Sequence, residues 1–223
     1  MAKLVWDQPG EKLWETGVDR TVLFPMNNGT YDDGVAWSGV TAINESPSGA
    51  EPSKIYADNI VYGVVMSPEE DSITIEAFTY PDEFCQCIGE AELGTGVTVK
   101  QQNHVHFGLA YRSLIGNDES GSKHGYKLHL FYRCVAGSSE DSNSTINDSP
   151  EQKTFSWSVT TIPVPITDSN GVVIADPASA IVIDSTKVSA TKLQAIEDLL
   201  YGTTNASASL PSPAQIKTIL DAA

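Results

Sequence analysis

The sequence predicts a mainly β protein, a single domain over residues 1–223 built as a β-sandwich or barrel with one or two α-helices near the C-terminus. Apolar and polar residues alternate with period two in several segments, which is typical of half-buried strands. Turn-forming residues separate these segments at the spacing of sandwich and barrel proteins. Helical spacing of apolar residues is seen only late in the chain. With 223 residues, of which 40% are hydrophobic, the chain can bury a sizeable core.

The chain begins with a segment that has no clear strand pattern. We expect residues 1–18 to form an N-terminal arm in which Trp6 and Trp14 contact a neighbouring molecule; packing on the chain's own core is the alternative. After this arm, the alternation predicts strands over Thr21–Pro25, Gly34–Ala42, Asn59–Met66 and Ser72–Tyr80, and a short strand within Gly94–Lys100.

Two long polar segments interrupt the predicted strands. Loops longer than about 12 to 15 residues are usually functional or disordered. Residues 44–58 are predicted to be a long loop, and the apolar Ile55 and Tyr56 near its end suggest that it packs against something. Residues 137–152 are predicted to be a polar loop, for which a mobile surface segment is an equally good interpretation.

The centre of the chain predicts a long antiparallel hairpin. His104–Leu114 and Tyr126–Val135 both alternate, and the turn-forming residues 116–125 lie between them. A further strand is predicted over Thr154–Thr160, where Phe155, Trp157 and Val159 share one face. The prolines that follow at positions 163 and 165 limit pairing beyond this strand.

The last part of the chain predicts one more strand, Ala180–Asp184, and then a helical segment over residues 189–223. In the first helix, Ser189 or Thr191 caps the start, Gly202 marks the end, and the apolar stripe consists of Leu193, Ile196, Leu199 and Leu200. A second, shorter helix is predicted to begin near Ser212 and Pro213.

The net charge of the chain argues against one class of function. The chain has 29 acidic and 13 basic residues and a net charge of −16, which argues against a protein that binds nucleic acid by neutralising phosphates. No apolar run approaches the roughly 20 residues that cross a bilayer, and the N-terminus lacks a signal-peptide pattern. We therefore expect a soluble protein made in a cytoplasm, without a membrane partner.

Residues with catalytic or metal-binding chemistry form no recognisable motif. Cys85 with Cys87, and His104 with His106, would place ligands on one face if both segments were strands, but structural zinc pairs usually have two to four intervening residues. Two core cysteines and two surface histidines are the simpler interpretation. An unrecognised pair of carboxylates remains open, but we expect no catalytic residues, no metal site and no cofactor.

A series of segments carries a resemblance of this sequence to a known protein family. They are KLVWDQPGEKLWETGVDRTVLFP, GVAWSGVTAINESPSGAEPSKIYADNIVYGVVM, EAFTYPDEFCQCIGEAEL, FGLAYRSLIGNDESGSKHGYKLHLFYRCVA, STINDSPEQKTFSWSVTTIPV and IDSTKVSATKLQAIEDLLYG. With these segments, in this order, the chain resembles the major tail protein, or tail tube subunit, of long-tailed, non-contractile (siphovirus-type) bacteriophages. The resemblance runs nearly end to end and includes no short chemical motif.

The resemblance implies a structural virion protein rather than an enzyme. Subunits of this family join their sheets into rings, commonly of six copies, and the rings stack into a tube. The implied partners are further copies of the chain, the tape-measure protein inside the tube, the tail terminator and distal tail proteins at its ends, and phage DNA in transit without specific binding. The implied location is the virion tail, with assembly in the host cytoplasm.

On this basis the long loop becomes the expected contact between rings, through Ser46, Pro47, Ser48, Gly49, Ile55 and Tyr56. Trp6 and Trp14 become the expected contacts of the N-terminal arm with a neighbouring copy. An acidic lumen would keep DNA from adhering, and Glu76, Asp118 and Glu119 are candidates to face it, with the outer surface as the alternative. The competing function is a virion-surface decoration or carbohydrate-binding β-sandwich module.

Overall fold

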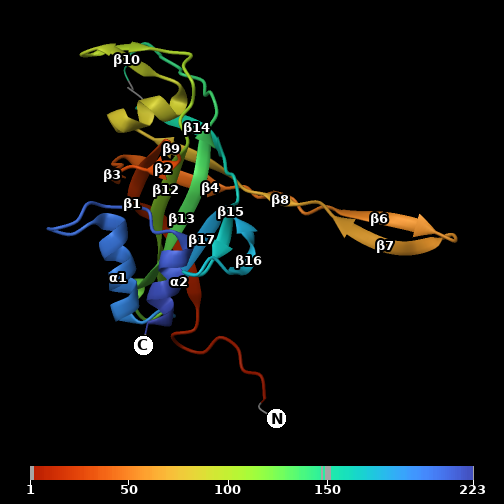
Figure 1. Ribbon diagram of the computed structural model, residues 1–223. Helices are drawn as coiled ribbons and strands as arrows, with labels where there is room; N and C mark the ends of the chain where they lie inside the picture. The colour runs from red at the N-terminus through yellow and green to blue at the C-terminus, as the bar shows by residue number, and fades with distance from the viewer. Residues whose placement is uncertain (1–2, 147, 149–151, 223) are drawn as a thin grey trace.

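The computed structural model describes residues 3–146, 148 and 152–222 of the chain. The described part is mainly β, with a large antiparallel sheet and two C-terminal helices (Figure 1). The strands before the central hairpin are β1 (Leu13–Asn27), β2 (Thr30–Tyr31), β3 (Val35–Ala36), β4 (Val40–Glu45), β5 (Ser48–Gly49), β6 (Pro52–Ala57), β7 (Ile60–Met66), β8 (Glu69–Glu70), β9 (Ser72–Ala77), β10 (Ala91–Gly94) and β11 (Val97–Val99). The later elements are β12 (Phe107–Asn117), β13 (Gly121–Ala136), β14 (Phe155–Thr160), β15 (Val164–Thr167), β16 (Val173–Ala178), β17 (Ala180–Asp184), α1 (Ala190–Tyr201) and α2 (Pro213–Asp221).

The main sheet has nine strands in the order β2-β1-β12-β13-β14-β9-β4, with β17 beside β13 and β3 beside β1. Its centre is the β12–β13 hairpin that the alternation predicted, in which Leu109 lies opposite Phe131 and Tyr111 opposite His129. The turn is shorter than expected, because β13 already begins at Gly121.

Two buried clusters lie on opposite faces of this hairpin. Alternate residues of β12 and β13 enter each cluster, as the period of two requires. One cluster lies between β12–β13 and the strands β9 and β14, and its aromatic side chains include Trp37, Phe84, Phe107, Phe131 and Trp157. The other lies beneath the helices, where Leu193, Ile196 and Leu200 of α1 and Ile216 of α2 pack on Leu128, Leu130 and Tyr132 of β13.

The helices begin and end close to the predicted positions. Ser189 precedes α1, and Gly202 follows it. Ser212 caps α2 in a capping box: its hydroxyl accepts from the backbone N–H of Gln215, whose side chain accepts from the backbone N–H of Ser212. No helix in the described residues is both long enough and apolar enough to span a membrane.

Two expectations from the sequence are wrong. Strand β1 begins at Leu13, so the predicted arm of residues 1–18 ends near residue 12, and Trp14 pairs with Gly116 of β12. Residues 44–58 are not a loop, because they contain β5 and β6. Cys85 and Cys87 lie in a 3₁₀ helix, η1 (Asp82–Ile88), so the strand condition for a zinc pair at these positions is not met.

Candidate functional site

A long hairpin projects from the body of the molecule and exposes many large apolar side chains. Strands β6 and β7 form this hairpin, and β5 and β8 connect it to the sheet. Figure 1 shows the hairpin extending far from the body, with no other element beside it. We call residues 46–71 the arm.

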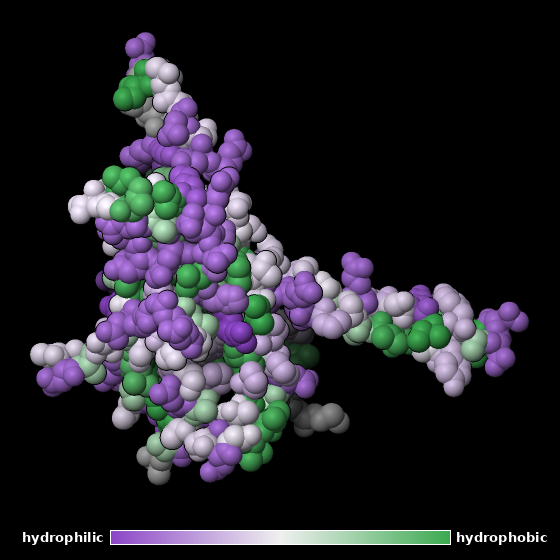
Figure 2. Space-filling model, turned by 45° about the horizontal axis from the view of Figure 1, so that its top comes forward, coloured by the Kyte–Doolittle hydropathy of each residue, from purple (hydrophilic) through white to green (hydrophobic). Residues whose placement is uncertain are grey.

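The arm is apolar in its middle part, mainly along β7. In Figure 2 hydrophobic side chains line the arm, while its tip and base are hydrophilic. Strand β7 reads Ile-Val-Tyr-Gly-Val-Val-Met, without a charged or amide side chain. The exposed large apolar residues of the arm are Ile55, Tyr56, Ile60, Val61, Tyr62, Val64, Val65 and Met66. Contiguous exposed apolar surface of this kind marks an interaction site.

Local sequence explains why these residues form a hairpin. Asp58 and Asn59 both have positive φ, of 51° and 65°, as the two central residues of a tight hairpin turn require. Asn and Asp tolerate this conformation better than most residues. At the other end, Gly49 has φ of 85°, and a Cβ there would lie 2.2 Å from the carbonyl oxygen of Pro68. Only glycine fits where the arm leaves β5.

The base of the arm is fixed to the body on both strands. Ser46 and Ser72 pair with each other there. The N–H of Ser46 donates to the carbonyl oxygen of Ser72 (2.8 Å), and the hydroxyl of Ser72 donates to the carbonyl oxygen of Ser46 (2.7 Å). Next to them, the hydroxyl of Ser179 donates to the carboxylate of Asp71. The hydroxyl of Thr161 donates to the carbonyl oxygen of Asp71 at 2.8 Å. The arm therefore leaves the body in a defined direction.

A polar cluster lies immediately before the arm, at the end of β4. Glu45 accepts a hydrogen bond from the hydroxyl of Tyr111, and its Oε1 lies 3.0 Å from Nδ1 of His129. The imidazole contact lacks the geometry of a well-aligned hydrogen bond. The same imidazole stacks on Tyr111 with ring centroids 4.5 Å apart, and its Nε2 lies 3.0 Å from Oγ of Ser113.

Ser113, His129 and Glu45 are thus ordered like the nucleophile, base and acid of a serine hydrolase. Nothing in the sequence signals this cluster, because Glu45 lies 84 positions before His129. Ser113 and His129 are each only 9% exposed, so the hydroxyl is shielded from solutes. We interpret the cluster as a contact that fixes β4, and with it the arm, to the β12–β13 hairpin.

Replacing Glu45 with Gln should lower stability in a pH-dependent way. His129, and then the Tyr111 hydroxyl, hold the pKa of Glu45 below its ordinary value near 4.5. A lowered pKa stabilises the fold above pH 4.5, and this contribution is lost as the pH falls through the pKa of the folded state. Because the Glu45 side chain is 40% exposed and screened by water, we expect E45Q to cost about 1 kcal/mol at pH 7.

Chemical denaturation of the wild type and E45Q from pH 7 down to pH 3 measures this difference. E69Q, a change at an exposed carboxylate of β8, is the matched control and should behave like the wild type. A difference for E45Q that stays constant down to pH 3 would show that the ionised carboxylate contributes nothing.

The outward face of β14, β9 and β4 is a second feature with functional interest. Ser156, Ser158 and Thr160 of β14 point outward, opposite the buried Trp157 and Val159. They lie beside Glu76, Thr74 and Ser72 of β9, which lie in turn beside Ala42 and Asn44 of β4. We call these residues the hydroxyl face; they include one carboxylate, Glu76, and neither Lys nor Arg. Strand β4 is the outer strand, and no described strand pairs with its second edge.

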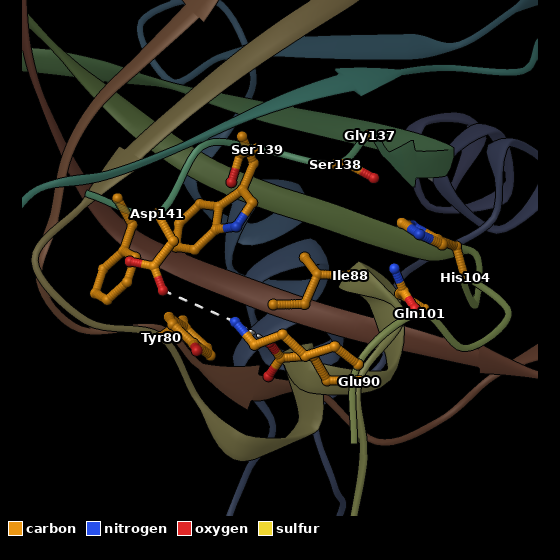
Figure 3. Close-up of a pocket in the computed structure, with 12 residues that line it drawn as sticks. Tyr80, Ile88, Glu90, Gln101, His104, Gly137, Ser138, Ser139 and Asp141 are labelled. Carbon is orange, nitrogen blue, oxygen red and sulfur yellow. Dashed lines mark ion pairs between the residues drawn. The ribbon is translucent and has the colours of Figure 1, made fainter. Parts of the chain in front are cut away.

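A cavity of about 200 Å³ lies beside β14, on the side of Phe155 and Trp157 (Figure 3). Tyr80, Phe155 and Trp157 form its aromatic wall. Lys100 lies 3.2 Å from Glu90 and 3.8 Å from Asp141. The charged groups that could bind a ligand are therefore already paired with one another.

The structure places the other predicted residues as follows. Ser46, Pro47, Ser48 and Gly49 lie at the base of the arm, and Ile55 and Tyr56 lie on β6. Trp6 is exposed ahead of β1, while the ring of Trp14 covers Gly116. Glu76 belongs to the hydroxyl face, and Asp118 and Glu119 lie in the β12–β13 turn, where Asp118 Oδ1 accepts from the N–H of Gly10.

The cysteines and histidines that were considered for a zinc site, Cys85, Cys87, His104 and His106, do not form one in the described residues. No group of three His, Cys, Asp or Glu side chains with metal-binding geometry occurs in the described ranges. Nδ1 of His104 lies 2.7 Å from the carbonyl oxygen of Ala136, and burial raises the pKa of Cys87 to about 12. Four residues of the predicted polar loop, 147 and 149–151, lie outside the described residues; 137–146 form neither helix nor strand.

Comparisons with known proteins give no further guide to the function. No model of a known protein family matches the chain, and no curated protein matches it significantly.

Proposed function

We propose that this chain is a structural virion protein that assembles into stacked rings, forming the tail tube of a long-tailed, non-contractile bacteriophage. In this role the tube encloses the tape-measure protein and later conducts DNA. The observation that carries the proposal is the arm: a projecting hairpin with an apolar middle part that no other part of the described chain covers. An isolated two-stranded hairpin is only marginally stable in water, so the arm requires a partner.

Two further features support assembly into a tube. The open edge of β4 offers backbone groups for pairing with a strand of a neighbouring copy. Pairing of this kind, repeated around an axis, closes a ring without free edges. The hydroxyl face lies on the same strands and would form the inner wall, where side chains without positive charge do not hold DNA.

The competing function is a decoration or carbohydrate-binding module, for which the aromatic wall of the cavity is the favouring observation. The pairing of Lys100 with Glu90 and Asp141 counts against it, because a sugar would have to displace these contacts.

Negative-stain electron microscopy and size-exclusion chromatography of the purified chain test the proposal. We expect rings or hollow tubes that grow in number with protein concentration. A chain that remains monomeric at millimolar concentration, or that forms only closed dimers, would contradict it.

A further inference from the structure

Each face of the β6–β7 hairpin carries exposed apolar side chains beside one polar residue, Ser53 or Lys54, and this follows from the strand register. On one face Val65 lies opposite Ser53, and Ile55 lies opposite Gly63. On the other face Met66 lies opposite Pro52, and Val64 lies opposite Lys54. We call these the Val65 face and the Val64 face. Tyr56 follows Ile55 along β6 and extends the Val64 face.

Strands that are covered on one side only have polar residues on the other side. Strand β14 shows this pattern, since its exposed positions are Ser and Thr. Strand β7 is instead apolar at every position that carries a side chain, which is typical of strands buried on both faces. Docking of one face alone would leave the other apolar face in water.

The charge of the β6–β7 part of the arm fits a partner that is another copy of this chain. Residues 52–66 contain Lys54 and Asp58 as their charged residues, so this segment is neutral, whereas the whole chain carries −16. This neutral segment of the arm approaches a strongly acidic copy without the repulsion that two −16 surfaces would experience.

The body also presents two exposed apolar hairpins that an arm could contact. Leu93 and Val97 lie on β10–β11, and Val173 and Ile174 lie on β16 of the β15–β16 hairpin. Figure 1 places β10 at the top of the body and β15–β16 in its lower half. Two separate receiving surfaces on each body match two apolar faces on each arm.

We propose that each arm is enclosed between two other copies of this chain, with the Val64 face against one copy and the Val65 face against the other. This inference rests on the proposed function and adds that every arm joins three chains. Enclosure between two copies explains why β7 is apolar on both faces.

Adjacent substitutions on the two faces test the enclosure. Val64 and Val65 are 55% and 54% exposed in the single chain and point to opposite faces, so V64E and V65E form a matched pair. We expect each to reduce the protein pelleted as tubes by roughly tenfold or more, because each places a charge in an apolar contact. V64L and V65L keep the contact apolar and should assemble. Wild-type-like assembly of either Glu variant would overturn two-sided burial.

Mixing experiments test whether copies of this chain are the occupants. A chain in which Asn-Gly replaces residues 50–68, which we call the armless chain, keeps both receiving hairpins but has no arm to donate. Added to the wild type, it should shorten the tubes in proportion to its fraction. Unchanged tube length would show that arms bind one another or a different protein, and would overturn the proposal.

The two hypotheses fail in different ways. A wild-type chain that stays monomeric overturns the proposed function and this inference with it. A wild-type chain that forms tubes while V64E or V65E does so equally well overturns the enclosure alone.

Discussion

The armless chain is expected to remain folded and monomeric and to form no tubes. Fully burying an apolar side chain contributes about 1.5–3 kcal/mol. Covering Tyr56, Ile60, Val64, Val65 and Met66 therefore contributes on the order of 10 kcal/mol before the costs of association are subtracted. Since each 1.4 kcal/mol changes an association constant tenfold, losing this contact should prevent assembly at any practical concentration. Sedimentation and electron microscopy of the purified chain measure this outcome.

The fold itself should survive the replacement. No residue of the arm between positions 50 and 68 belongs to either buried cluster, and the β5–β8 pair that remains suits a two-residue Asn-Gly turn. Surface changes of this kind alter stability by about 0.5 kcal/mol or less, so the melting temperature should stay within about 2 °C of the wild type.

A matched control changes only the tip of the arm. Asn59→Gly supplies the residue that a tight hairpin turn prefers and leaves both apolar faces intact, so it should assemble like the wild type. Normal tubes from the armless chain would remove the arm from the assembly mechanism.

The main sheet was predictable where one face of a strand is buried and the other is not. In β14, Trp157 and Val159 alternate with Ser and Thr, and the sequence placed this strand correctly. The β12–β13 hairpin was also found, although both of its faces are covered, because bulky and small residues alternate along it. Local periodicity is sufficient to predict such strands, because their two faces lie in different surroundings.

The arm was predicted only in part, and its sequence shows why. Pro47, Pro52 and several polar residues make the first half typical of a loop, so β6 was missed while β7 was found. The Asp58-Asn59 pair between two β-rich runs was the available signal for a hairpin. Strands β15 and β16 were missed because Pro165 and Pro177 lie within them.

Contacts between distant segments could not be predicted at all. Glu45, Tyr111 and His129 meet because the sheet brings the end of β4 against the β12–β13 hairpin. Neither the spacing of these residues nor their types indicate that approach. The same holds for the hydroxyl face, whose members come from three strands and are ordinary Ser and Thr residues in the sequence.

A single positive charge added to the hydroxyl face of each copy should make the tube bind DNA. Ser158 lies on this face beside Thr74, and S158K would add one cation per copy, or six per ring if rings contain the six copies that the resemblance implies. Each phosphate that a lysine contacts makes the logarithm of the binding constant fall by about 0.9 for each tenfold rise in salt. We therefore expect S158K tubes to form normally and to bind DNA strongly at low salt but weakly at high salt.

Two DNA substrates reveal which side of the tube this face occupies. A short linear duplex enters an open lumen, whereas a closed circular plasmid reaches only the outer surface. Pelleting S158K tubes at about 0.1 M salt should bring down the linear duplex and leave the plasmid in solution, and wild-type tubes and the neutral variant S158N should bring down neither. Pelleting of the plasmid as well would place the hydroxyl face outside. The measurement separates the two surfaces because electrostatic attraction acts within about one Debye length, roughly 10 Å at 0.1 M salt, which is short enough to confine it to the side of the wall where the lysine lies.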